Sequence, residues 1–138
     1  MKKTRLIFLA IIIMALLPQV LSSTPNESRR IARGRYLVED VSMCGDCHTP
    51  LTANGQPNRQ RWLDGAQLGF KPLHPMPWFA KSPRIAGLPG LTKREAVKLL
   101  ETGLLPNGQR LLPPMPQFRF SHRDAEAVVA YLESLKKP

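Results

Sequence analysis

The pentapeptide Cys44-Gly45-Asp46-Cys47-His48 decides the fold of this 138-residue chain. It holds both cysteines of the sequence, two residues apart, and a histidine follows the second one directly. On one helical turn, two such thiols can each add to one of the two vinyl groups of a haem. The histidine then lies beneath the iron and can coordinate it through a ring nitrogen. The pattern predicts one covalent haem, with Cys44 and Cys47 as its anchors and His48 as the proximal iron ligand.

Three other kinds of site use a similar pair of cysteines. A thioredoxin-like redox pair lies beside a strand–helix–strand unit, and the sequence has no run of Val- and Ile-rich strands. A zinc site needs four ligands, but beyond the pentapeptide the chain offers only His74 and His122, which do not stand at a paired-ligand spacing. A disulfide across so small a loop would remove little entropy from the unfolded chain. These readings remain as alternatives to haem attachment.

The N-terminal segment has the layout of an export signal. Three basic residues precede an almost unbroken apolar stretch, residues 6–17, and a small residue suited to cleavage follows at Ser22. We expect residues 1–23 to be a secretory signal peptide and residues 24–138 to form one mono-haem domain. An uncleaved membrane anchor is the alternative, because the apolar stretch approaches the ~20 residues that span a bilayer. Either way, the domain is expected in the periplasm, where bacteria attach haem covalently.

Charge limits the kinds of partner. Without residues 1–23 the chain has 17 basic and 10 acidic residues, a net charge of +7. A positive surface favours acidic protein partners or anionic lipid headgroups and can speed encounter. Nucleic acid is not expected as the partner of an exported chain.

Three helices are predicted, separated by a proline-rich middle. The first extends from about Ser28 to Val41, and Gly34 within it indicates a close approach by another helix. The second begins at Thr92, which forms a capping box with Glu95, and Gly103 marks its end. Between them and beyond, residues 50–116 contain 11 of the 14 prolines, which excludes mostly regular structure.

A third helix closes the chain. Ser121 and Asp124 form a box-like start, and apolar residues then recur on one face. If the first and last helices cross, Tyr131 and Leu132 are the natural contacts of Gly34. An apolar cofactor would supply the centre that the proline-rich loops lack.

A haem iron bound by His48 needs a ligand on its opposite face. Met43 lies too close to the attachment cysteines, which leaves Met76 and Met115. Both are flanked by prolines that hold the backbone extended. His74 and His122 are weaker candidates, since each is read more simply as a surface or loop residue.

These features resemble a class I c-type cytochrome across essentially all of residues 24–138. The chain is similar in particular to the small mono-haem domains that serve as electron-transfer subunits of bacterial periplasmic dehydrogenases. The matching segments are Gly34-Arg35-Tyr36-Leu37, the cysteine motif followed by Thr49-Pro50, Pro114-Met115-Pro116, and Ala130-Tyr131-Leu132.

The resemblance implies an all-α, cytochrome c-like fold in which crossed N- and C-terminal helices and long proline-rich loops enclose one haem. It implies Met115 as the distal ligand, with Met76 as the rival. It also implies a proline carbonyl that orients His48, for which Pro50 and Pro57 are both candidates.

Two features are not settled by the resemblance. The segment Phe70–Arg84 fits the family pattern poorly and looks like an insertion. Trp62 and Trp78 are reasonable haem neighbours, because each offers an apolar face and one donor for a propionate, but both could equally be core residues.

The predicted function is single-electron transfer between redox proteins, by a soluble shuttle or a non-catalytic subunit of a dehydrogenase. Partners with an acidic docking surface, and association with a membrane, are expected. Two alternatives stay open: a haem enzyme or gas sensor with an open sixth coordination position, and a structural subunit whose haem is incidental.

Overall fold

The computed structural model describes residues 25–137 of the chain. The expected signal peptide, residues 1–23, lies outside the described residues. The elements follow one another as helices α2 (Pro25–Tyr36), η1 (Leu37–Val41, π-helical), α3 (Cys44–His48) and η2 (Arg59–Arg61, 3-10), strands β1 (Ala66–Gln67) and β2 (Lys81–Ser82), and helices α4 (Lys93–Thr102) and α5 (His122–Ser134). The predicted all-α class is confirmed, because the only sheet in this region is a pair of two-residue strands.

The first predicted helix is observed as α2 continued by η1. Glu27 in its first turn and Arg33 and Arg35 in its last complement the helix dipole. At Leu37 the chain widens into a π-turn, which directs Leu37 and Val38 into the core. The haem motif begins at Cys44 on α3, three residues after η1 ends at Val41.

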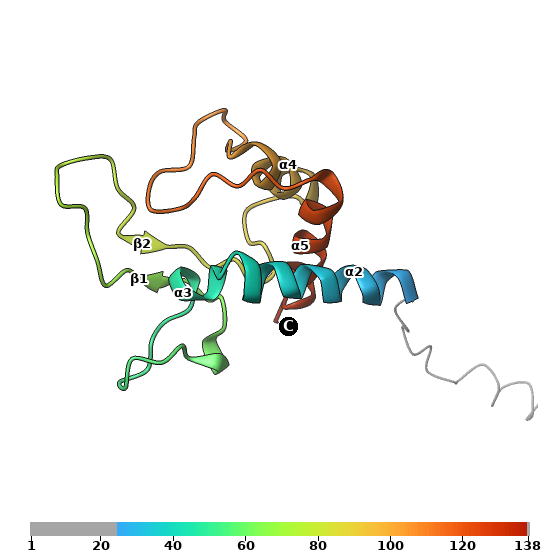
Figure 1. The fold of residues 1–138 in the computed structure, drawn as a ribbon, viewed down its shortest axis with the longest axis horizontal. Coiled ribbons are helices and arrows are strands. Elements are labelled where there is room, and N and C mark those ends of the chain that lie inside the picture. Colours follow the sequence, from blue (N-terminus) through green and yellow to red (C-terminus); the bar gives the residue numbers. More distant parts are fainter. Residues whose placement is uncertain (1–24, 138) are drawn as a thin grey trace, which may run out of the picture.

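Helices α2 and α5 cross, as Figure 1 shows, and Gly34 of α2 lies at their closest approach. A Cβ atom at Gly34 would lie 1.8 Å from the carbonyl oxygen of Ala127 and 2.8 Å from Cβ of Tyr131. The expected contact with Tyr131 is confirmed. Ala127, one turn earlier on α5, makes the other close approach in place of Leu132, because side chains four apart share a helix face. Leu132 instead joins the core cluster.

The other two helices begin where their caps predict. Thr92 accepts a hydrogen bond from the Glu95 backbone N–H while the Glu95 carboxylate accepts one from Thr92, which completes the capping box of α4. Gly103 ends α4 with φ 71°, a left-handed conformation that glycine adopts without strain. Ser121 caps α5 through the Asp124 N–H, but the Asp124 carboxylate pairs with Arg33 of α2 instead of returning to the cap.

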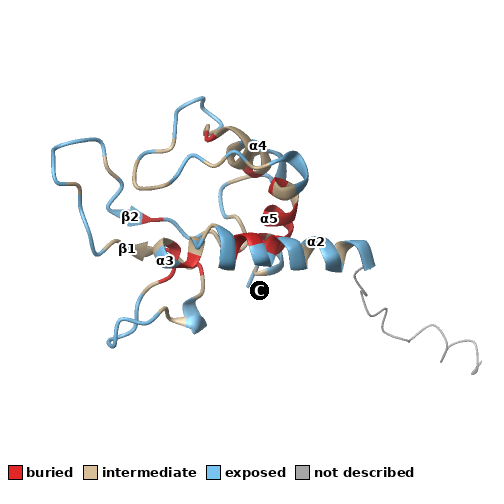
Figure 2. Ribbon diagram, in the orientation of Figure 1, coloured by how far each residue is buried: buried red, intermediate tan, exposed pale blue. Residues whose placement is uncertain are grey.

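The buried residues gather where α2, η1 and α5 meet, as Figure 2 shows in red. This cluster contains Leu37, Val38, Leu63, Ala86, Val128, Tyr131 and Leu132. The proline-rich region contributes only Leu63 and Ala86 to this cluster. Among the described helices, none is both long enough and apolar enough to cross a membrane.

The β1–β2 hairpin leaves the body of the molecule near α3. Ala66 pairs with Ser82 and Gln67 with Lys81 in antiparallel register. Its connecting loop extends away from the helices, opposite the start of α2 (Figure 1). The segment Phe70–Arg84, expected to be an insertion, therefore forms most of this loop and the second strand.

Candidate haem-binding site

Helix α3 presents the haem motif as one short turn. Met43 precedes it in a left-handed conformation, φ 48°, which starts the new helix at Cys44. A Cβ atom at Gly45 would lie 2.2 Å from the Trp62 ring, so the indole packs directly on this turn. A larger residue at this position would have to displace the indole.

His48 is buried, with 5% of its surface exposed, and its Nδ1 atom lies 2.7 Å from the carbonyl oxygen of Pro83. A carbonyl can only accept, so Nδ1 carries the proton and donates the hydrogen bond. The Nε2 atom is then left with its lone pair for a metal. Burial lowers the pKa of His48, which keeps the imidazole neutral as a ligand must be.

The proline carbonyl that orients His48 was expected at Pro50 or Pro57, and both expectations are wrong. The Pro50 carbonyl accepts from the Asn58 N–H, and Pro57 pairs with Leu51 in a small loop bridge. Pro83 takes the role because the β1–β2 hairpin folds residue 83 back onto α3. Sequence reasoning missed it, since the spacing from the motif depends on the length of the inserted loop.

The base of the hairpin holds α3 through two further bonds. The Gly65 N–H donates to the His48 carbonyl at 2.7 Å, and the Ser82 hydroxyl donates to the Cys47 carbonyl. The Ser82 oxygen also accepts from the Ala66 N–H at 3.0 Å. No sequence signal pointed to Ser82, because a hydroxyl can donate to whichever main-chain carbonyl the fold places beside it.

A cavity of about 870 Å³ opens beside α3. Its walls are mostly apolar, and they come from the hairpin, from the loop before α4 and from the proline-rich loop before α5. The lining includes Cys44, Cys47, His48, Leu68, Phe70, Phe79, Ile85, Leu88, Leu99, Leu111, Pro114, Met115 and Phe118. This size and lining are typical of a site for a large apolar cofactor.

The lining of the cavity distinguishes Met115 from the other candidate distal ligands. Met115 lines it together with His48, whereas Met76 does not and is 48% exposed. His74 is exposed on the hairpin loop, and His122 is exposed on α5, where its Nδ1 lies 2.7 Å from a Glu101 carboxylate oxygen. Of the four candidates, only Met115 shares a cavity with the proximal histidine.

The environment of the thiols disfavours the alternative cysteine chemistries. Burial raises the pKa of Cys44 to about 11 and also raises the pKa of Cys47. Redox-active pairs and metal-binding thiols need an accessible thiolate, which a lowered pKa supplies. In the described part of the chain, no group of three or more His, Cys, Asp or Glu side chains is placed to hold a metal ion.

The residues present fit a haem. Two thiols and a neutral imidazole lie on one wall of an apolar cavity, and Lys81, Arg84 and Arg110 supply positive charge at its lining for the propionates. Bound haem supplies one-electron iron chemistry. The protein would hold it through Cys44 and Cys47, with His48 beneath the iron.

Neither tryptophan is among the residues that line the cavity, and the interpretation of each as a haem neighbour stays a prediction. The Trp62 indole N–H donates to the Tyr131 hydroxyl at 3.3 Å, which makes it a core residue between α3 and α5. Trp78 lies edge-on to Phe70 with ring centroids 5.7 Å apart. Its buried indole N–H has no partner in the part of the chain that the structure describes.

Comparisons with known proteins agree with this site. A sequence profile of the family described as cytochrome c matches residues 31–136. The chain is 29% identical over 123 residues to the fructose dehydrogenase cytochrome subunit of Gluconobacter japonicus, covering 86% of this chain and 24% of that protein. It is 54% identical over 33 residues to a diheme cytochrome c-type protein of Cereibacter sphaeroides, covering 24% of this chain and 11% of that protein.

The chain thus spans about a quarter of the dehydrogenase subunit that it matches and carries a single haem motif. The profile match covers the second half of α2, the motif on α3, the Met115 loop and all of α5. This chain belongs to the cytochrome c family and holds one covalent haem c.

Proposed function

We propose that this protein is an exported mono-haem electron carrier in which His48 and Met115 are the two axial iron ligands. Family membership and the relative named as a cytochrome subunit support electron transfer. The observation that carries the ligand assignment is the cavity, which Cys44, Cys47, His48 and Met115 line together. The chain itself is not an enzyme in this proposal.

The residues of the chain make such a site suited to electron transfer. The Pro83 carbonyl fixes the ring of His48, so the proximal side reorganises little. On the other wall, prolines on both sides of Met115 restrict its backbone. A thioether in this position raises the reduction potential above that of a bis-histidine site. With both axial positions filled by protein, no site remains for a substrate on the metal.

The rival function is a haem enzyme or gas sensor, which needs an open sixth position. It would require Met115 to stay unbound or to leave readily. Absorption spectra of the haem-loaded protein separate the two functions. We expect a low-spin ferric spectrum with the weak long-wavelength band of a methionine–iron bond, and a ferrous spectrum that carbon monoxide does not change. A high-spin spectrum that shifts with carbon monoxide would reject electron transfer.

Paired variants test the ligand itself. Met115→Ala should lose the methionine band, bind carbon monoxide and lower the reduction potential, because the thioether is removed. Met76→Ala is the matched control, since Met76 lies outside the cavity lining, and it should keep the wild-type spectrum. The reverse result would assign the iron to Met76.

The proposed location is the periplasm, after removal of residues 1–23. The mass of the purified protein tests this directly, because cleavage gives a chain beginning at or near Thr24 with its haem attached. A full-length mass in the membrane fraction would support the uncleaved anchor instead.

The proposed partners are redox proteins with acidic docking surfaces, such as the other subunits of a dehydrogenase. The relative's name supports a dehydrogenase, and the net charge of +7 on residues 24–138 supports acidic surfaces. Whether the chain is a shuttle or a fixed subunit is tested by co-purification at low and high salt, because a shuttle held by charge should dissociate as salt rises.

A further inference from the structure

The tip of the β1–β2 hairpin, residues 71–77, has no role in holding the fold. Leu73 is 96% exposed and Met76 is 48% exposed. Within the described chain, these seven residues form no hydrogen bond and no ion pair. They also do not line the haem cavity. Large exposed apolar side chains that do not serve the core are typical of a surface that binds something.

The hairpin anchors the two ends of this tip. The Leu68 N–H donates to the Ala80 carbonyl at 2.9 Å, and the Phe79 N–H donates to the Pro113 carbonyl at 2.9 Å. The edge-on contact of Phe70 with Trp78 closes the hairpin just below the tip. Three of the seven tip residues are prolines, which restrict the backbone further. A segment ordered beforehand loses little entropy on binding.

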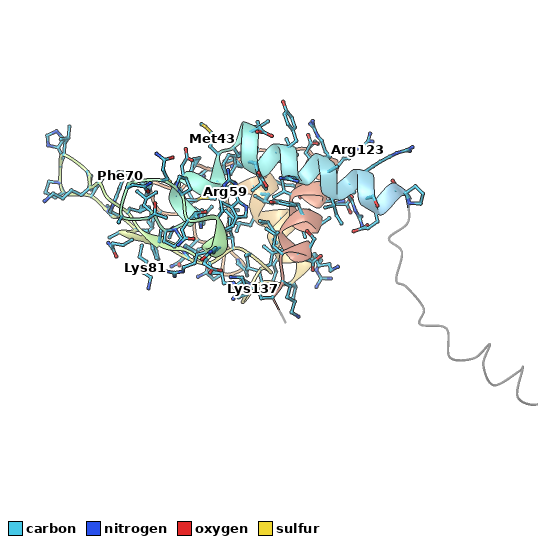
Figure 3. The ribbon with its side chains drawn as sticks, turned by 90° about the horizontal axis from the view of Figure 1, so that it is seen from below. Met43, Arg59, Phe70, Lys81, Arg123 and Lys137 are labelled. Carbon is cyan, nitrogen blue, oxygen red and sulfur yellow. The ribbon has the colours of Figure 1, made fainter. Side chains whose placement is uncertain are left out.

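The tip lies next to the haem cavity. Phe70 and Phe79, on either side of it, line the cavity, and Lys81 lies at its lining too. In Figure 3 the loop extends beyond Phe70, away from the helices, while Lys81 marks its base. A protein seated on the tip would therefore stand beside the cavity that is proposed to hold the haem.

The charged residues on the hairpin and at its base are all basic. The sequence has no acidic residue between Asp64 and Glu95, and within this stretch Lys71, Lys81 and Arg84 lie on the hairpin or at its base. Opposite charges at the rim of an interface steer encounter and set the register of docking. A partner surface complementary to the tip is therefore an apolar groove with an acidic rim.

From these observations we propose that residues 71–77 are the docking element for the redox partner, inserting Leu73 and Met76 into an apolar groove with an acidic rim. This inference rests on the proposed electron-transfer function. A membrane is the less suitable occupant, because sequence-readable lipid recognition involves clusters of about 4–8 basic residues and the tip has one. A small contact of this kind suits the brief encounters of electron-transfer proteins.

A gold electrode tests the proposal without knowledge of the partner. The probe is a mixed monolayer of methyl- and carboxylate-terminated thiols, which presents the proposed chemistry. A quartz crystal microbalance measures the haem-loaded protein that adsorbs, and voltammetry measures the rate of electron transfer. Leu73→Ser should raise the concentration for half coverage about tenfold, because it removes a leucine side chain that the contact would bury. Lys71→Glu should raise it about threefold at low salt and less at high salt.

Matched controls separate the tip from general surface effects. Leu51→Ser removes another leucine that is 61% exposed, and Arg29→Glu reverses a charge on exposed α2. Both should leave adsorption and electron-transfer rate unchanged. If the two tip variants behave like these controls, the proposal is wrong. It is also wrong if the protein sediments with phosphatidylglycerol vesicles and Leu73→Ser abolishes that binding, because the tip then serves a membrane.

The test also separates this inference from the proposed function. Coverage is measured by mass, so the tip is tested even where no redox signal is seen. A wild-type protein that adsorbs through the tip but gives no reversible one-electron wave would reject electron transfer alone. A reversible wave that no tip variant alters would reject the docking element alone.

Discussion

The Nδ1 atom of His48 lies 2.7 Å from the carbonyl oxygen of Pro83, a residue 35 positions further along the chain. The orientation of the proximal imidazole therefore depends on the base of the β1–β2 hairpin. The neighbouring Ser82 ties the same hairpin to the Cys47 carbonyl. Together these bonds couple the short haem-binding helix to a strand that carries no haem ligand.

We expect Ser82→Ala to loosen this coupling. It removes the hydroxyl that donates to the Cys47 carbonyl and accepts from the Ala66 N–H, and should lower the free energy of unfolding by about 2 kcal/mol, measured by chemical denaturation. It should also move the paramagnetically shifted NMR signals of the His48 ring and change the reduction potential. Ser134→Ala is the matched control, because its hydroxyl also donates to one main-chain carbonyl, that of Tyr131. A similar stability loss in both variants, with the His48 signals unmoved in both, would contradict a positioning role for Ser82.

Gly34→Ala should destabilise the protein strongly. An alanine normally favours a helix over glycine by about 1 kcal/mol. Here the added methyl group would lie 1.8 Å from the Ala127 carbonyl oxygen, and main chain cannot move aside without separating α2 from α5. We expect a net loss of about 3 kcal/mol in unfolding free energy, measured by denaturant titration. Gly69→Ala, where a Cβ atom has no neighbour within 4 Å, should be nearly neutral.

Tyr131→Phe tests the hydrogen bonds that connect α5 to the segments packed around the haem motif. The Tyr131 hydroxyl accepts from the Trp62 indole at 3.3 Å and donates to the Glu39 carboxylate. Its removal leaves both partners short of a hydrogen bond and should cost about 1–3 kcal/mol of unfolding free energy. Tyr36→Phe, at a half-exposed position on α2, should cost much less. If both variants lose the same unfolding free energy, the hydrogen bonds of the Tyr131 hydroxyl contribute nothing to stability.

The same hydroxyl predicts the response to alkali. Burial raises the pKa of Tyr131 to about 12. The unfolded chain ionises this phenol near pH 10, so the folded state binds the proton more tightly. Its contribution to stability is complete below pH ~10 and is lost as the pH rises to about 12. Denaturation midpoints across this range should fall more steeply for the wild type than for Tyr131→Phe.

His122 predicts a second pH effect, near neutrality. The hydrogen bond that the His122 ring donates to the Glu101 carboxylate, together with the charges of Glu101 and Glu126, raises the pKa of His122. A raised folded pKa means that the stabilisation is complete below about pH 6.5, the ordinary value, and is lost as the pH rises through the folded value. NMR titration of the His122 ring should show the shift, and His122→Asn should remove this step from the stability profile. A titration at the ordinary value would contradict the ion pair.

Sequence reasoning located the covalent chemistry because that chemistry is local. Two thiols and an imidazole must lie within one turn of chain to meet one haem, so their spacing is sufficient evidence. The caps at Thr92 and Ser121 and the end at Gly103 are local for the same reason, since each bonds residues at most four positions away. The close approach at Gly34 was readable because only a missing side chain permits it.

Which residues contact the haem motif was decided by the tertiary structure. Every residue has a main-chain carbonyl, so nothing in the sequence separates Pro83 from Pro50 or Pro57 as the acceptor for His48. Only the path of the hairpin brings residue 83 back to α3 and leaves its tip exposed beside the haem cavity. Trp62 likewise packs on Gly45 and Tyr131 because two distant segments meet there. The sequence by itself determined that a haem is attached, and the folding of the long loops determined what surrounds it.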